Sequence, residues 1–283
     1  MSKQGYRTAT IQHSVRTLRA VARKCNLLSP ETVKDYLARA TVSETRKVKI
    51  CADLGRFYKY KGIQFDKPRY RKIETLPFIP LEVEVSQLVS GVGRKTACFL
   101  QLLKETGMRP GEAYDLKWAD LDLERGTVTV LPEKHSHARQ LKISPHLIAM
   151  MKRLQRKWPL VFRNPSIQKE NSLHVFRRHY VQQRKRLADK LQNPRLNSIT
   201  FKTLRHFYAT LLYSRTRDLL LVKENLGHRA IQNTLVYTHL VKFDSDEYTC
   251  KAARTLEEAK ALVETSFDYL TTFEGYMIFR KRK

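Results

Sequence analysis

Apolar residues recur at helical spacing through most of the first 60 positions of the chain. Between residues 9 and 25 they fall three and four positions apart, and four basic residues lie elsewhere on the helical wheel. The positions expected to face inward are Ile11, Val15, Leu18, Val21 and Ala22. Ser29 before Pro30, and later Ser43, are typical helix starts. The pattern therefore predicts a small helical domain over residues 1–64.

The helical period is lost between residues 65 and 80. Three prolines interrupt this stretch, and basic residues stand among them. The pattern predicts an extended basic linker, and such a run of Lys and Arg can lie along a phosphate backbone. Its candidate phosphate contacts are Lys67, Arg69, Arg71 and Lys72, which join Arg16, Arg19, Arg23 and Lys24 of the first predicted helix.

Residues 81–244 predict a second domain that is mainly helical with a small sheet. A helix over Arg94–Thr106 is expected to end at Gly107, which places Arg109 in a turn between helices. Residues 127–131 and 139–143 alternate between apolar and polar, as two paired strands do, and Lys134 falls in the loop between them. Further helices are predicted over residues 145–157, 175–192, 201–214 and 218–226, the last closed by Gly227.

The last segment, residues 245–283, has a less regular pattern. It predicts one helix over residues 256–263 and one short strand over residues 276–279. Together the segments predict an α+β fold, mainly α with small β-sheets.

The charge of the chain points to a polyanionic partner. Fifty-four Lys and Arg against 27 Asp and Glu give a net charge of +27 over 283 residues. Residues 1–80 alone carry 18 basic and 6 acidic side chains, so both predicted domains are basic. Nucleic acid is the expected partner. A generally basic surface, as in ribosomal proteins, is the alternative.

Cysteine usage and hydropathy give expectations about the compartment. The four cysteines form no C-x-x-C pair and are expected to be core thiols in a reducing environment. No window approaches about 18 uninterrupted apolar residues, and the N-terminus lacks the apolar stretch of a signal peptide. We expect a cytoplasmic protein without membrane contact. His135, His137, His174 and His179 have the look of metal ligands, but no acidic cluster accompanies them, and no metal or other cofactor is expected.

Five residues of the second domain have the chemistry that a phosphodiester reaction needs. Guanidinium groups pair with phosphate oxygens through a planar fork, and Arg109 and Arg205 are the candidates. Lys202, three residues before Arg205, is expected on the same helical face. His228 can donate a hydrogen bond or accept a proton, and Tyr237, nine residues later, can attack the phosphorus.

The order of these residues resembles the tyrosine recombinase and phage-type integrase family. The likeness rests on Thr106–Glu112, on Lys202–Arg205, on His228 and on Tyr237 at a nine-residue spacing. The family's second motif is usually H-x-x-R, whereas this chain has Lys202 at the first position. The C-terminal segment resembles the tails of archaeal integrases.

The resemblance implies roles for individual residues. Arg109, Lys202, Arg205 and His228 would activate the phosphate, with Glu112 in support. Tyr237 would form a 3' phosphotyrosyl bond. Lys134 is similar to the strand-loop lysine that protonates the leaving 5' oxygen, and Lys202 is the alternative acid.

The resemblance also implies an architecture and a partner. It implies a helical core-binding domain and a catalytic domain that together form a C-shaped clamp on double-stranded DNA. Four protomers would bring two duplexes together. The C-terminal tail would dock on a neighbouring subunit. The implied function is site-specific recombination by an integrase without metal or ATP. Chromosome-dimer resolution, type IB topoisomerase-like relaxation and a catalytically silent DNA-binding protein remain alternatives.

Overall fold

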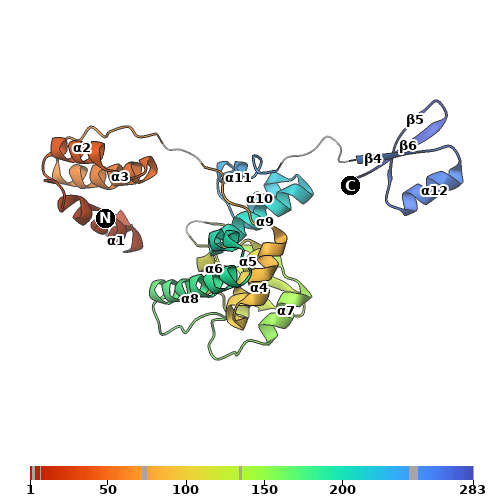
Figure 1. Cartoon of the computed structure of the whole chain (residues 1–283), viewed down its shortest axis with the longest axis horizontal. Helices are drawn as coiled ribbons and strands as arrows, with labels where there is room; N and C mark the ends of the chain where they lie inside the picture. The colour runs from red at the N-terminus through yellow and green to blue at the C-terminus, as the bar shows by residue number, and fades with distance from the viewer. Residues whose placement is uncertain (2–3, 7, 72–74, 134–135, 242–247, 283) are drawn as a thin grey trace. The chain divides into compact units, whose positions relative to one another are not determined.

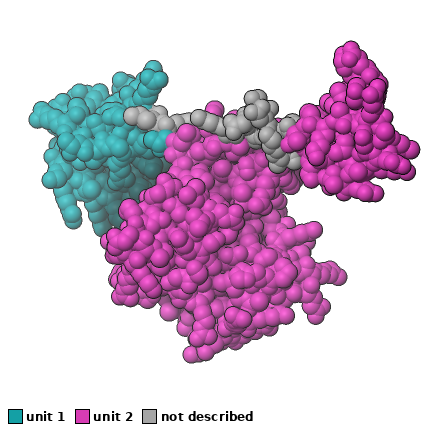
Figure 2. Space-filling view, turned by 45° about the vertical axis from the view of Figure 1, so that its right-hand side comes forward, with its two compact units in different colours: residues 1–75 teal, residues 76–283 magenta. Residues whose placement is uncertain are grey.

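The structure, a computed structural model, describes residues 1, 4–6, 8–71, 75–133, 136–241 and 248–282. The chain forms two compact units, residues 1–75 and 76–283, which Figure 2 distinguishes by colour. Each unit has its own hydrophobic core. No described helix is long and apolar enough to cross a lipid bilayer.

The N-terminal unit consists of three helices, as predicted. They are α1 (Thr8–Ala22), α2 (Pro30–Arg39) and α3 (Glu44–Lys61) (Figure 1). Ser43 caps α3, because its side chain accepts a hydrogen bond from the Arg46 amide. Ser29 occupies the N-cap of α2 without a side-chain hydrogen bond. The core consists of Val21, Val33, Leu37, Ile50, Cys51, Leu54 and Tyr58.

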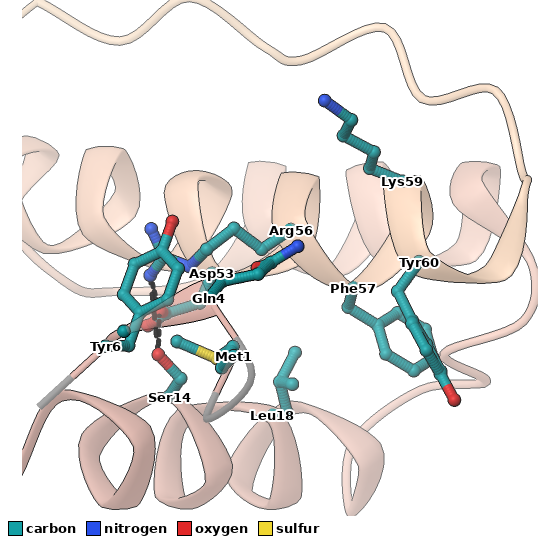
Figure 3. A pocket seen from close by; sticks show the side chains of 11 residues that line it. Met1, Gln4, Tyr6, Ser14, Leu18, Asp53, Arg56, Phe57, Lys59 and Tyr60 are labelled. Atoms are coloured by element: carbon teal, nitrogen blue, oxygen red, sulfur yellow. Dashed lines mark hydrogen bonds and ion pairs between the residues drawn. The ribbon is translucent and has the colours of Figure 1, made fainter. Parts of the chain in front are cut away.

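The inward face of α1 differs from the prediction. Val15 is 37% exposed and Ala22 is exposed, whereas Ser14 is buried, so the placement of Val15 and Ala22 in the core was wrong. Ser14 Oγ donates to Asp53 Oδ1 at 2.6 Å, and Arg56 pairs with the same carboxylate. A buried carboxylate needs such donors, which explains why a serine replaces an apolar residue here. Figure 3 shows these three side chains at a pocket between α1 and α3.

The first half of the predicted linker packs onto the helices of the N-terminal unit. The described residues between 65 and 80 contain no helix or strand. Phe65 and Tyr70 contact the helical core, and the Phe65 ring lies 4.5 Å from that of Tyr58. The basic residues of this stretch that the structure describes are exposed, namely Lys67, Arg69 and Arg71. Lys72 lies outside the described residues.

The second unit is built around α5 (Arg94–Thr106). The helices α4 (Glu82–Gly91), α7 (Pro145–Lys152), α8 (Lys169–Lys190) and α9 (Phe201–Thr216) complete its main core (Figure 1). Phe99 of α5 lies at the centre, with the rings of Phe162, Phe176 and Phe201 between 4.9 and 5.1 Å away. The predicted helices are confirmed, although α7 ends five residues early and α8 begins six residues early.

A three-stranded antiparallel sheet borders this core. It has the order β1 (Leu121–Asp122), β2 (Thr127–Val130) and β3 (Arg139–Lys142). The predicted hairpin is confirmed, with Val128 opposite Leu141 and both side chains buried. Strand β1 was not predicted, because two residues are too few to give an alternating pattern.

Short α-helices complete the part of the second unit before residue 242. They are α6 (Pro110–Tyr114), α10 (Leu219–Leu226) and α11 (Gln232–Leu235). Both predicted glycine caps are confirmed, since Gly107 ends α5 at φ 59° and Gly227 ends α10 at φ 64°. These positive φ values favour glycine, and each turn carries a predicted site residue.

Residues 248–282 form a small sheet covered by one helix. The elements are β4 (Tyr248–Ala253), α12 (Leu256–Glu264), β5 (Asp268–Phe273) and β6 (Tyr276–Arg282), with sheet order β4-β6-β5. Their core is Ala253, Ala259, Phe267 and Phe279. The predicted helix and last strand are confirmed, whereas β4 and β5 were missed. Cys250 is exposed on β4, so its prediction as a core thiol was wrong.

Candidate active site

Arg109 is fixed by the turn between α5 and α6. It occupies the N-cap of α6, directly before Pro110. The side chain of Glu112 turns back to accept the Arg109 backbone amide at 3.0 Å and Arg109 Nη1 at 3.0 Å. This local arrangement follows from a helix start with an acidic residue three positions on. It leaves the Arg109 side chain 24% exposed at the surface of the site.

Glu112 also binds a second arginine from the sheet. Arg139 Nη2 donates to Glu112 Oε2 at 2.8 Å, and Arg139 Nε donates to the Asn225 carbonyl at 2.7 Å. Burial alone would raise the pKa of Glu112, but the hydrogen bond and charge of Arg139, with those of Arg109, bring the pKa below its ordinary value. Glu112 is therefore a buried carboxylate anion that holds two guanidinium groups.

Ser136 connects Arg109 to the turn after α10. Its hydroxyl accepts from Arg109 Nη1 at 2.6 Å and donates to the Gly227 carbonyl at 2.6 Å. The residue is 7% exposed. The hairpin loop, the first arginine and the segment before His228 are thus joined by one buried hydroxyl.

Arg205 lies on α9 and is buried, with 6% exposure. Its Nη1 donates to the Gly107 carbonyl and its Nη2 to the Leu226 carbonyl, both at 2.7 Å. Those carbonyls lie at the C-terminal ends of α5 and α10, where a cation is favoured. Burial and the charge of Arg109 lower the pKa of Arg205 to about 10, so the guanidinium stays charged at neutral pH.

Tyr237 is packed among apolar side chains. It is 2% exposed and packs with Ala209, Val222 and Leu226. Its hydroxyl lies 3.2 Å from Nδ1 of His206, which follows Arg205 on α9. Burial raises the pKa of Tyr237, against the charges of Arg205 and Arg109, which lower it. The free phenol is therefore protonated at neutral pH.

The two histidines of the site are neutral. Burial and the charges of Lys202 and Arg205 lower the pKa of His206 to about 4. Burial and the nearby arginines lower the pKa of His228 to about 3. Nδ1 of His228 lies 2.9 Å from Oγ1 of the buried Thr234, which orients the ring just after Gly227. A neutral imidazole has one ring nitrogen free to accept a hydrogen bond.

The contacts bring four of the six predicted catalytic residues into one cluster: Arg109, Arg205, His228 and Tyr237. Lys202 is exposed on the first turn of α9, and its charge acts on His206. Lys134 lies outside the described residues. The described part of the chain contains no group of three or more His, Cys, Asp or Glu side chains that could hold a metal.

Three side chains of the cluster were not singled out from the sequence: Ser136, Arg139 and His206. Each acts through a contact with a residue at least 27 positions away. The only sequence signal was the place of His206 next to Arg205, and neighbours on a helix are rotated by about 100° from each other. Proximity in sequence therefore did not indicate a shared site.

A comparison with family models decides the relationship. The model described as the phage integrase family matches residues 82–242, more than half of the chain. The chain belongs to the phage integrase family. Its matched region contains α4 to α11 and the whole cluster around Tyr237.

Curated relatives of this integrase-family chain are 28% identical to it over the aligned residues. An integrase/recombinase of Escherichia coli is 28% identical over 214 residues, which cover 62% of this chain and 63% of that protein. The tyrosine recombinase XerC of Pediococcus pentosaceus is 28% identical over 232 residues, which cover 73% of each protein. The chain thus spans just under two thirds of the Escherichia coli relative.

Solved structures show the same fold. The Tn1549 transposon integrase in complex with transposon right end DNA has a TM-score of 0.64 at 15% identity, covering 92% of this chain and 94% of that one. A lambda integrase dimer bound to a COC' core site has a TM-score of 0.60 at 14% identity, covering 87% and 76%. The mainly helical architecture with small sheets is therefore that of integrases.

Proposed function

We propose that this integrase-family chain is a site-specific DNA recombinase that cleaves and rejoins strands through a 3' phosphotyrosyl intermediate. The single observation that carries the proposal is that the segments of Arg109, His228 and Tyr237 meet around Arg205 and Ser136. Arg205 ties the segment before Arg109 to the segment before His228, and Ser136 ties the same two segments again. A buried phenol lies beside them.

The cluster suits a phosphodiester anion. Arg109, Arg139 and Arg205 bring three positive charges against the one carboxylate of Glu112. Within the described residues, Arg109 Nη2 and Nε make no hydrogen bond, so they are available to phosphate oxygens. Fixed guanidinium groups stabilise charge that develops on these oxygens during attack. Arg139 and Glu112 hold the first arginine and are positioning residues.

Tyr237 attacks the phosphorus in this proposal, and a proton has to leave its hydroxyl. Neutral His206, 3.2 Å away, accepts it through Nδ1 when Nε2 carries the ring hydrogen. The new bond joins Tyr237 Oη to phosphorus, the bond to the 5' oxygen breaks, and that oxygen takes a proton from Lys134 or Lys202. Attack by a DNA hydroxyl reverses the steps and rejoins the strand, with no ATP consumed.

The DNA and the assembly are also part of the proposal. The curated relatives include proteins named as Xer recombinases, and the solved neighbours include a transposon integrase. We propose that double-stranded DNA is the partner and that both basic units contact its phosphates. Arg16 and Arg19 of α1, and Arg23 and Lys24 directly after it, are exposed, which suits phosphate contact. Four protomers would act together, with residues after 244 docking on a neighbour.

Strand exchange distinguishes this function from relaxation of supercoils. The chain is incubated, without metal or ATP, with plasmids that carry two copies of a candidate site from its genomic surroundings, or none. A recombinase gives rearranged products only from the two-site plasmids. Relaxation of both plasmids without rearrangement would support a topoisomerase-like activity instead. Binding without either product would support the catalytically silent alternative.

A further inference from the structure

A basic pocket borders the proposed active site and shares Lys202 with it. It has a volume of about 370 Å³ and is formed by α8, the N-terminus of α9 and the start of α6. Its polar lining is Arg177, Arg184, Thr200 and Lys202, with Pro110 at the edge. Pro110 follows Arg109 directly, so the pocket borders the first arginine of the site without including it.

Arg184 is a buried cation that is only partly satisfied. It is 7% exposed, and Nη1 donates to the Ile199 carbonyl at 2.6 Å. Its guanidinium lies 5.5 Å from the centre of the Tyr180 ring. Among the described residues, Arg184 Nε has no hydrogen-bond partner and no carboxylate pairs with the guanidinium. A buried, unpaired guanidinium is costly unless an anion compensates it.

The surrounding groups add positive potential in the same place. Lys202 lies in the first turn of α9, a helix of 16 residues whose N-terminal amides carry partial positive charge. Arg177 is exposed on α8, one helical turn before Val181, which also lines the pocket. None of the eight lining residues is acidic. The pocket therefore selects for an anion that can pair with guanidinium forks.

We propose that this pocket binds a second backbone phosphate of the DNA duplex, next to the one that Tyr237 attacks. The inference rests on the proposed function for the identity of the anion. Successive phosphates of one strand are about 3.4 Å apart along the duplex axis, so a neighbour of the attacked phosphate falls close by. Binding it would fix the register of the strand, because two held phosphates define both position and direction.

The test compares Arg177→Gln with Arg178→Gln in the full chain. Arg178 follows on the same helix, is exposed and carries the same charge, but does not line the pocket. Affinity for a duplex of arbitrary sequence is measured by fluorescence anisotropy at several salt concentrations. Loss of one phosphate contact lowers the log-log salt slope by about 0.9, and this is expected for Arg177→Gln and not for Arg178→Gln. Equal slopes for the two variants would overturn the proposal.

A second arm locates the phosphate. Once the cleavage site is known, single phosphates around it are replaced by uncharged methylphosphonates. Wild type and Arg178→Gln are expected to lose about tenfold in affinity at one position beside the attacked phosphate, whereas Arg177→Gln is insensitive there. Insensitivity of Arg177→Gln only at the attacked phosphate would overturn the assignment of a second site.

The two arms separate this inference from the recombinase proposal. The salt slope needs no cleavage, so it tests the pocket even if the chain proves catalytically silent. If wild type cleaves DNA while Arg177→Gln keeps the wild-type slope and sensitivity, only the pocket assignment fails.

Discussion

The hydroxyl of Tyr237 lies 3.2 Å from Nδ1 of His206, and His206 directly follows the buried Arg205 on α9. The same helix thus carries a group that can bind the phosphate and a group that can take the proton of the nucleophile. Because the pKa of His206 is lowered to about 4, the imidazole is neutral and available as an acceptor at physiological pH.

Replacing His206 by Asn is expected to slow DNA cleavage by about 10²-fold, the lower end of what a positioned general base contributes. DNA affinity is expected to change little, because the neutral ring carries no charge toward phosphate. The measurement is the rate of covalent adduct formation between pH 6 and pH 9. The variant rate is expected to rise with pH, because solvent has to take the proton. A pH profile parallel to wild type would contradict the role of base.

The depressed pKa of His206 also predicts how stability depends on pH. In the unfolded chain the imidazole titrates near 6.5, whereas in the folded chain it titrates near 4. Between these values the unfolded state binds more protons, so stability present above pH 6.5 is lost as the pH falls toward 4. His206→Asn is expected to lose less stability than wild type between pH 7 and pH 5, as measured by urea unfolding. An identical loss in the two proteins would show that His206 does not contribute.

Glu112→Gln is expected to destabilise the second unit by about 3 kcal/mol, because it leaves the guanidinium groups of Arg109 and Arg139 without their shared anion. The control is Glu82→Gln. Glu82 is 58% exposed and pairs with Lys104 at 3.2 Å, so its loss is expected to cost less than about 1 kcal/mol. Urea unfolding gives both free energies of unfolding. An equal loss of unfolding free energy in the two variants would contradict the role of Glu112 as the shared anion of Arg109 and Arg139.

Ser136→Ala removes the hydroxyl that joins Arg109 to the Gly227 carbonyl. We expect a loss of about 1–2 kcal/mol in stability, since a buried carbonyl loses its donor. Adduct formation is expected to fall by about tenfold, because Arg109 is held less firmly. Ser90→Ala is the control, since Ser90 is exposed and bonds only within its own helix. Activity equal to that of the control would show that Arg109 needs no support from Ser136.

Local signals predicted the elements that frame the site. Gly107 and Gly227 end their helices at positive φ, and the alternation around Val128 marks the hairpin, because these features depend on a few neighbouring residues. The four clustered residues Arg109, Arg205, His228 and Tyr237 were also predicted, partly through the family resemblance. Their type, order and spacing are visible in the sequence.

Features that depend on distant partners were not predicted. Ser14 replaces Val15 on the buried face of α1 because Asp53, 39 positions later, needs a donor. Ser136 and Arg139 belong to the site only because Arg109, Glu112 and the end of α10 meet them in three dimensions. Neither hydrophobic periodicity nor motif spacing carries such information. The same holds for the pocket around Arg184.

Covalent trapping tests the central claim most directly. Wild type and Tyr237→Phe are incubated without metal with nicked duplexes from the chain's genomic surroundings, so that the cleaved fragment diffuses away. The account predicts a denaturant-resistant protein–DNA adduct with wild type and none with Tyr237→Phe, and mass spectrometry is expected to find the nucleotide on Tyr237. An adduct that persists in Tyr237→Phe would contradict the assignment of the nucleophile. Absence of any adduct with wild type, while it binds the same DNA, would contradict the enzymatic function itself.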